Sequence, residues 1–261
     1  MIRLEQMQKP GSMITPLNKI DEKDFVADLV VRDYRTADVF KKYDIDYCCG
    51  AKWPLQTACE VRGLDTGLIK EELEQAIRTI HTSNALPFAE WPLDFLVDYI
   101  MYVHHAYLRH ALPLLKEFLD HFIAEHRKKY AYLDELQQQF LGLFTSLPVY
   151  MKQQEETIFP YIKQVNRAWL AKEPFGGLLT RTLRKPVEKV MDQEHQLAVS
   201  ALLKFRELTN NYTLPVNACK SHRVVFMKLI ELDNDLVQHL YLENKIILPR
   251  LLTIEKELSK Q

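Results

Sequence analysis

Apolar residues recur every three or four positions along most of this chain, and an amphipathic helix requires that repeat. One stretch shows it with little interruption, through Leu93, Leu96, Val97, Ile100, Met101, Leu108, Leu112 and Leu115. The 261 residues include only seven glycines, whereas β-rich chains need many tight turns and usually more glycine. The pattern therefore predicts an all-α protein.

The second part of the chain predicts four long helices, which cover residues 93–128, 132–165, 184–210 and 218–258. Pro148 would kink the second helix if it lies inside it. Gly176 and Gly177 mark the connection between the two halves, and Pro215 marks the last turn. Helices of this length in this order are typical of a four-helix bundle.

The first part predicts a small helical domain over residues 21–84, preceded by a flexible lead-in at residues 1–20. Short helices are expected over residues 24–31, 35–43 and 65–80. Another helix begins near Pro54, whose fixed φ suits a first turn, and ends at a cap on Gly63. Residues 85–92 are interpreted as the linker to the bundle, which takes residues 93–261.

Composition narrows the class of protein. With 47% hydrophobic and 26% charged residues, the chain can form a real core, and a net charge of −1 argues against a nucleic-acid partner. No apolar run reaches the ~20 residues that span a bilayer, and the first residues are polar. We therefore expect no membrane association and a cytoplasmic location. Four cysteines do not suggest a disulfide framework, which fits a reducing compartment.

Two segments of the bundle align with each other without a gap: residues 239–249 (HLYLENKIILP) and residues 150–160 (YMKQQEETIFP). His239 and Glu243 are four positions apart, so they share one helix face at a distance of roughly 6 Å. A bundle helix uses this spacing to offer two ligands to one metal ion. The second segment carries Tyr150 and Gln154 at the equivalent positions.

A weak internal repeat extends this symmetry. His105 precedes Tyr150 by 45 positions, and His195 precedes His239 by 44. Each half is therefore predicted to be a helical hairpin, with one candidate ligand position on its first helix and two on its second. In a four-helix bundle made of two such hairpins, all six candidate positions can face the centre. His126 would lie about 31 Å along the first helix from His105, too far to share an ion, and we expect a structural role for it. We expect the same of His104, His110, His121 and His222.

In these features the chain resembles the iron–sulfur cluster repair di-iron proteins, in which a small cysteine-bearing domain precedes a hemerythrin-like bundle. The bundle carries the resemblance in His105, eight positions before Pro113, and in residues 190–195 (VMDQEH), 215–219 (PVNAC) and 239–249. The N-terminal part carries it in residues 46–50 (DYCCG), 58–59 (AC) and 63–65 (GLD). The resemblance implies two irons held by four histidines and two bridging carboxylates.

Carried onto this sequence, the implied metal ligands are His105, His195, His239 and Glu243. Tyr150 stands at the remaining histidine position, as a phenolate ligand or as a space-filling residue, and Gln154 stands at the remaining carboxylate position. Glu155 does not simply replace it, because one step along a helix turns a side chain by about 100°. A neutral amide cannot bridge two cations as a carboxylate does, so we expect iron as one or two ions with partial occupancy.

Cys48 and Cys49 are the predicted catalytic residues. They precede the helix that begins near Pro54 and lie close to Lys52, and both a helix N-terminus and a positive charge favour a thiolate. The alternative is a loop pair of ordinary reactivity. We expect the other two cysteines to be packing residues, Cys59 and Cys219.

The resemblance implies an iron-binding stress-response protein that helps to restore iron–sulfur centres damaged by oxidative or nitrosative stress. We expect no conventional enzymatic turnover. The implied partners are damaged iron–sulfur proteins and diatomic ligands such as NO or O2, and a homodimer is possible. Two alternatives stay open: a metal-depleted hemerythrin-like scaffold or sensor module, and a mononuclear-iron enzyme that acts on NO, O2 or peroxide.

Overall fold

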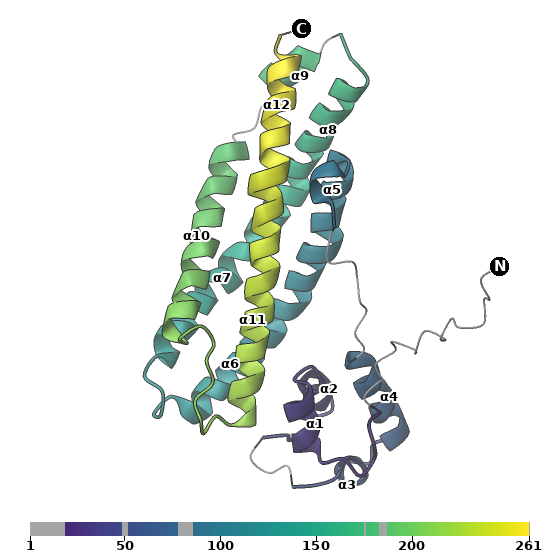
Figure 1. Ribbon diagram of the computed structural model, residues 1–261, viewed down its shortest axis with the longest axis vertical. Coiled ribbons are helices and arrows are strands. Elements are labelled where there is room, and N and C mark those ends of the chain that lie inside the picture. Colours follow the sequence, from purple (N-terminus) through teal and green to yellow (C-terminus); the bar gives the residue numbers. More distant parts are fainter. Residues whose placement is uncertain (1–18, 49–51, 78–85, 175, 183–186, 261) are drawn as a thin grey trace, which may run out of the picture. The chain divides into compact units, whose positions relative to one another are not determined.

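The computed structural model describes residues 19–48, 52–77, 86–174, 176–182 and 187–260 (Figure 1). Across these ranges the regular elements are helices, and one isolated bridge pairs Phe25 with Pro54. This confirms the all-α prediction. The chain divides into two compact units, residues 1–82 and 83–261. No helix in the described ranges is long and apolar enough to cross a membrane.

The first unit contains four short helices: α1 (Val26–Arg32), α2 (Thr36–Lys42), α3 (Leu55–Val61) and α4 (Thr66–Ala76). Their apolar faces meet in one core, which includes Val30, Ala37, Phe40, Leu55, Cys59 and Leu73, all fully buried. Cys59 is therefore a packing residue, as expected. The sequence placed each of these helices within a few residues of its observed bounds.

Two local signals decide where α3 ends and α4 begins. Gly63 has a φ of 65°, and the N–H groups of Gly63 and Leu64 bond back to the carbonyls of Glu60 and Cys59. This pairing is a Schellman motif, so the predicted glycine cap is confirmed. The Asp65 carboxylate then caps α4 by accepting hydrogen bonds from the N–H groups of Gly67 (2.8 Å) and Leu68 (3.2 Å).

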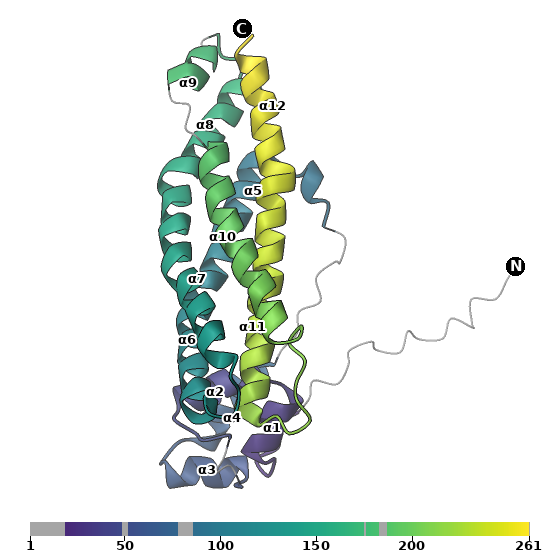
Figure 2. The ribbon, with the colours of Figure 1, turned by 90° about the vertical axis from the view of Figure 1, so that its left-hand side faces the viewer.

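The second unit is built from four long helical rods, counted within the described residues (Figures 1 and 2). Three of the rods are interrupted by a π-helical segment. The first rod consists of α5 (Leu93–Tyr99), η3 (Ile100–His105) and α6 (Ala106–His126), and the second of α7 (Leu133–Gln153), η4 (Gln154–Ile158) and α8 (Phe159–Leu170). The third rod is α10 (Val187–Leu208), and the fourth consists of α11 (Lys220–Tyr241), η5 (Leu242–Ile247) and α12 (Leu248–Leu258). The rods alternate in direction, with α7 packed against α6 and α10, and α11 against α6. This is the four-helix bundle that the sequence predicts.

The π-helical segments all occur at candidate site residues. His105 ends η3, Gln154 begins η4, and Glu243 lies in η5. Two of the segments precede a proline, Pro160 or Pro249, which has no N–H and would clash with the carbonyl four residues earlier. A local switch to wider hydrogen bonding relieves that clash and changes the angular phase of the helix at the site.

Two further elements pack against the rods: η2 (Phe88–Glu90) against η5, and α9 (Gly176–Thr182) against α8 and α12. The 3₁₀ turn η2 falls in the stretch expected to be a linker, and Phe88 and Trp91 pack against the apolar core of the bundle. The exact extent of the linker stays a prediction. The glycine connection forms the helix α9, where a Cβ on Gly177 would lie 2.7 Å from the backbone oxygen of Leu258. Glycine therefore lets α9 approach α12 closely.

The cap on α4 offers a test of the first unit. Asp65→Ala removes the acceptor of two N–H groups, and we expect it to lower the local unfolding free energy of α4 by about 1 kcal/mol. Amide hydrogen exchange on the full chain should then be about fivefold faster in α4. Asp65→Asn, which keeps a side-chain oxygen, should retain most of the protection. Unchanged exchange in Asp65→Ala would show that the cap contributes nothing.

Candidate metal centre

Six polar side chains from all four rods meet inside the bundle. Their residues are all nearly or fully buried, with exposed fractions between 0% and 4%, and they are His105, Tyr150, Gln154, His195, His239 and Glu243. The structure thus brings together the four sequence-predicted ligand residues and the two residues, Tyr150 and Gln154, that the resemblance places at the remaining ligand positions. Polar groups buried this deeply must satisfy one another or a bound ion.

Glu243 lies between the two halves of this cluster. Its Oε1 faces the Nε2 atom of His239 at 3.3 Å. Its Oε2 faces the other half, 2.6 Å from His195 Nε2 and 3.4 Å from the Tyr150 hydroxyl. Each oxygen of this single carboxylate therefore serves one half of the cluster.

Two histidines are held from outside by their Nδ1 atoms. His105 Nδ1 lies 2.6 Å from Glu155 Oε1, and His195 Nδ1 lies 2.9 Å from Asn244 Oδ1. A hydrogen bond from Nδ1 to an outer acceptor orients the ring so that its Nε2 atom points inward. Glu155 is itself paired with the Arg109 guanidinium. This arrangement is common around histidines that bind metal ions.

Within the described residues, His239 is one of several buried groups without hydrogen-bond partners, and the Nε2 atom of His104 is another. Both ring nitrogens of His239 are buried, and neither has a hydrogen-bond partner in the described part of the chain. Its ring stacks on His104 with centroids 5.4 Å apart, and it lies 5.2 Å from the His105 ring. His104 pairs with Asp235 at 2.8 Å and is almost fully buried. His104 therefore packs against the His239 ring at the edge of the cluster, in keeping with a structural role.

Gln154 occupies the space between the two halves. Its amide nitrogen donates to the Tyr150 hydroxyl at 2.8 Å and, in a short bond, to Glu243 Oε1. Its amide oxygen lies 3.1 Å from His105 Nε2. The amide thus lies among the groups that an ion would need to contact. This explains why no three His, Cys, Asp or Glu side chains of the described residues form a ready-made metal cluster.

The electrostatics of the cluster favour a charged carboxylate and a neutral imidazole. Burial would raise the pKa of Glu243, but the electrostatic attraction of His239 and the hydrogen bond with His195 hold it well below its usual range. Burial, together with the neighbouring His239, lowers the pKa of His105. A neutral imidazole beside an ionised carboxylate is the protonation state in which both groups can bind a cation.

Comparison with known proteins bears directly on this cluster. The family model described as hemerythrin HHE cation binding domain matches residues 96–251, and the ScdA_N model, described as a domain of unknown function (DUF542), matches residues 22–77. The chain is 31% identical over 225 residues to proteins named iron-sulfur cluster repair protein YtfE from Escherichia coli O81 (strain ED1a) and Escherichia coli O157:H7. The match covers 85% of this chain and 93% of each relative.

The chain belongs to the hemerythrin-like iron–sulfur cluster repair family. Escherichia fergusonii has a further YtfE relative with the same identity and coverage. This membership confirms the resemblance that the sequence motifs indicated. The sequence did not identify Glu155, Asn244 or Asp235 as partners of the cluster. These contacts join different helices, and the only local hint is that Asn244 follows Glu243 directly.

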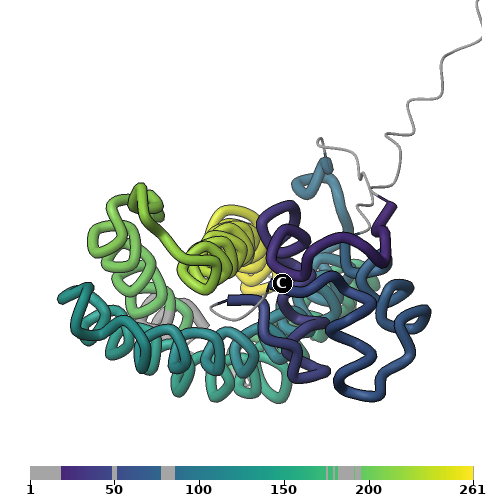
Figure 3. Tube along the Cα trace, turned by 90° about the horizontal axis from the view of Figure 1, so that it is seen from below, coloured from purple at the N-terminus to yellow at the C-terminus, as the bar shows by residue number. Residues whose placement is uncertain are grey.

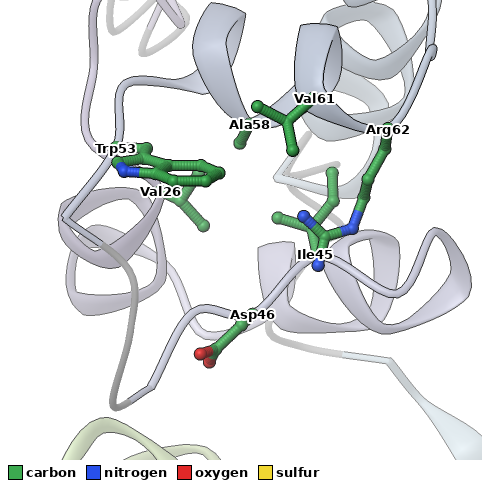
Figure 4. Close-up of a pocket in the computed structure, with 7 residues that line it drawn as sticks. All are labelled: Val26, Ile45, Asp46, Trp53, Ala58, Val61 and Arg62. Atoms are coloured by element: carbon green, nitrogen blue, oxygen red, sulfur yellow. The ribbon is translucent and has the colours of Figure 1, made fainter.

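The cysteine motif of this repair-family chain lies in the first unit. Cys48 is partly buried, and its N–H donates to Asp46 Oδ1 at 2.8 Å, while Cys49 falls outside the described residues. Figure 4 shows a pocket of about 520 Å³ beside this loop, lined by Val26, Ile45, Asp46, Trp53, Ala58, Val61 and Arg62. α3 has only seven residues, so the helix-terminus argument for a thiolate carries less weight than the sequence suggested.

The hydrogen bonds of Tyr150 can be tested in metal-free protein of this repair-family chain. Tyr150→Phe leaves the Gln154 amide and His195 without one partner each, and we expect it to lower the unfolding free energy of the bundle by about 1–3 kcal/mol. The matched control is Tyr241→Phe, because Tyr241 is 54% exposed. Urea unfolding of chelator-treated protein measures both variants. Equal stabilities for Tyr150→Phe and the parent would show that the hydroxyl is not part of a stabilising network.

Proposed function

We propose that this protein binds a single iron ion in its bundle and helps to restore iron–sulfur centres damaged by oxidative or nitrosative stress. Membership of the repair family supports the general role. The observation that carries the single ion is the asymmetry of the cluster. In one half, both ring nitrogens of His239 lack a hydrogen-bond partner among the described residues. The other half is closed by hydrogen bonds among Tyr150, His195, Gln154 and Glu243.

His105, His239 and Glu243 would hold the ion. Their donor set, two imidazoles and one carboxylate, suits iron, and the unmet nitrogens of His239 are consistent with it. The Gln154 amide would have to release Glu243 Oε1 first. One carboxylate leaves a pair of divalent ions poorly compensated, which favours one ion over two. His195 stays on Glu243 Oε2 and fixes the orientation of the carboxylate.

When bound, iron supplies the redox and Lewis-acid chemistry that attracts small ligands such as NO or O2. The chain's own residues then have defined tasks. Glu155 and Asn244 keep the histidine rings oriented, and the fully buried core around the cluster excludes bulk water. Cys48 and Cys49 would handle a transferred group or dock the damaged iron–sulfur protein from the first unit.

A second candidate is a metal-depleted scaffold or sensor. The specific observation in its favour is that Gln154 satisfies Glu243 without any ion, since its amide donates to both Glu243 and Tyr150. A bundle closed in this way could persist after losing stable metal. Iron measured per chain, in protein purified from iron-replete cells, separates the candidates: a value near one supports the first, and a value near zero supports the scaffold.

Restoring the altered positions should restore a second metal ion. Tyr150→His together with Gln154→Glu adds an imidazole and a bridging carboxylate, so we expect the iron content to rise from about one towards two per chain. The matched control places the same changes at exposed positions, Tyr241→His with Gln153→Glu, and should leave the content unchanged. No gain in the first double variant would mean that the altered positions do not limit loading. His239→Ala in the parent chain should remove the single ion.

The cysteine pair can be separated from the bundle by the same measurements. Cys48→Ala with Cys49→Ala should abolish recovery of a [4Fe–4S] enzyme inactivated with NO, because the thiols are lost. Its iron content should match the parent, because the predicted ligands all lie in the second unit. Cys59→Ala, in the same unit as the pair, is the control and should retain repair. Full repair by the double variant would reduce the pair to loop structure.

A further inference from the structure

A second cluster of potentially reactive side chains lies where α6 ends and α11 begins. The Cys219 sulfur is 3.4 Å from the Nε2 atom of His126. His126 is the last residue of α6, about 31 Å along that helix from His105, so this pair is separate from the candidate metal centre. The sequence suggested only a packing role for Cys219 and a structural role for His126.

The orientation of His126 makes it a base toward the thiol. Its Nδ1 atom lies 3.1 Å from the carbonyl oxygen of Phe122, which has no hydrogen to give, so Nδ1 must donate. In the neutral ring the Nε2 atom then carries a lone pair, and it faces the Cys219 sulfur. A nucleophile, a base and a third group that orients the base are together the arrangement that activates a catalytic thiol.

The sulfur also receives groups that stabilise a negative charge. Cys219 is the N-cap of α11, a helix of 22 residues, and its sulfur accepts a hydrogen bond from the N–H of His222 at 3.4 Å. The Ser221 hydroxyl lies 3.0 Å away. A long helix presents partial positive charge at its N-terminus, and an adjacent imidazolium adds a full one. The Glu125 carboxylate lies 3.9 Å from His126 Nδ1.

His222 has a ring nitrogen without a hydrogen-bond partner among the described residues, and its ring carries no charge near pH 7. Burial and the nearby His126 and Lys129 lower its pKa to about 4, so the ring is neutral near pH 7. It is fully buried, its Nε2 atom bonds to the Tyr132 hydroxyl, and its Nδ1 atom has no partner among the described residues. The residue whose N–H binds the sulfur thus has a ring nitrogen without a hydrogen-bond partner among the described residues.

We propose that Cys219 and His126 form a peroxide-reactive thiol site. The thiol proton moves to His126 Nε2, and the thiolate attacks one oxygen of a hydroperoxide. An S–O bond forms, the O–O bond breaks, and the leaving hydroxide or alkoxide takes the proton from His126. The sulfur is oxidised by two electrons to a sulfenic acid, and the hydroperoxide is reduced to water or an alcohol.

Access favours a small oxidant. Cys219 is only partly exposed, and Ser221 and His126 flank its sulfur. The connection from α10 to α11, lime green in Figure 3, leads into Cys219, and Val216 within it is fully exposed. A partly exposed sulfur between two side chains favours a small hydroperoxide over a bulky disulfide.

The test follows sulfenic acid formation at each cysteine. The full chain is treated with hydrogen peroxide and dimedone, and labelled peptides are quantified by mass spectrometry. The reference for an ordinary, fully exposed thiol is Val216→Cys combined with Cys219→Ser. Although it is less exposed, Cys219 in the parent should be labelled about tenfold faster than that reference, because the thiolate is more populated. Labelling no faster than the reference overturns the proposal.

Two variants test whether His126 causes the reactivity of Cys219. His126→Gln should slow labelling of Cys219 about tenfold, whereas His121→Gln, an exposed change on the same helix, should not. An unchanged rate in a folded His126→Gln protein also overturns the proposal, and if that variant does not fold, the comparison with the exposed thiol decides. His239→Ala should keep the labelling of Cys219 at the parent rate. This arm makes a failure of the metal proposal distinguishable from a failure of this one.

Discussion

The bundle is organised around one fully buried carboxylate, Glu243. An ionised group without water must be surrounded by donors or cations, or it loses its charge. Each of the four helical rods supplies a polar side chain to the cluster around this carboxylate, and the neighbouring histidines hold its pKa low despite burial. The rest of the second unit, with its apolar positions filling the space between the rods, keeps these donors in place.

The two altered positions change how that charge is compensated. Tyr150 and Gln154 contribute hydrogen bonds to the cluster, and the Gln154 amide donates to both Tyr150 and Glu243. A hydrogen-bond network with a single carboxylate can stabilise the bundle without metal, but it offers less negative charge to a second cation. Stability and metal capacity are therefore opposed at this one place. His239, whose ring nitrogens have no hydrogen-bond partner within the described ranges, lies in the half for which we propose the ion.

The π-helical segments explain how neighbouring residues of one helix can serve the same imidazole. Gln154 reaches the Nε2 side of His105 and Glu155 reaches the Nδ1 side. Glu155 does not take the place of the missing carboxylate, as the sequence predicts, but it has a task that the sequence did not reveal. Departures from regular α-helix are frequent at functional sites because they re-aim side chains without ending the helix.

The sequence alone determined the helical class, the four long helices and the six positions that converge, because apolar periodicity and ligand spacing are local properties of a helix. It also determined the cap at Gly63, since only a residue without a Cβ readily adopts that φ. Only the tertiary structure decided which oxygen of Glu243 serves which half, and which side chains hold the histidines from outside. Those contacts join residues about 50 or more positions apart, such as His105 with Glu155 and His195 with Glu243. The contact between Cys219 and His126 likewise joins residues that are far apart in the sequence. Their geometry depends on how the helices pack and rotate against one another, and no local pattern encodes that rotation.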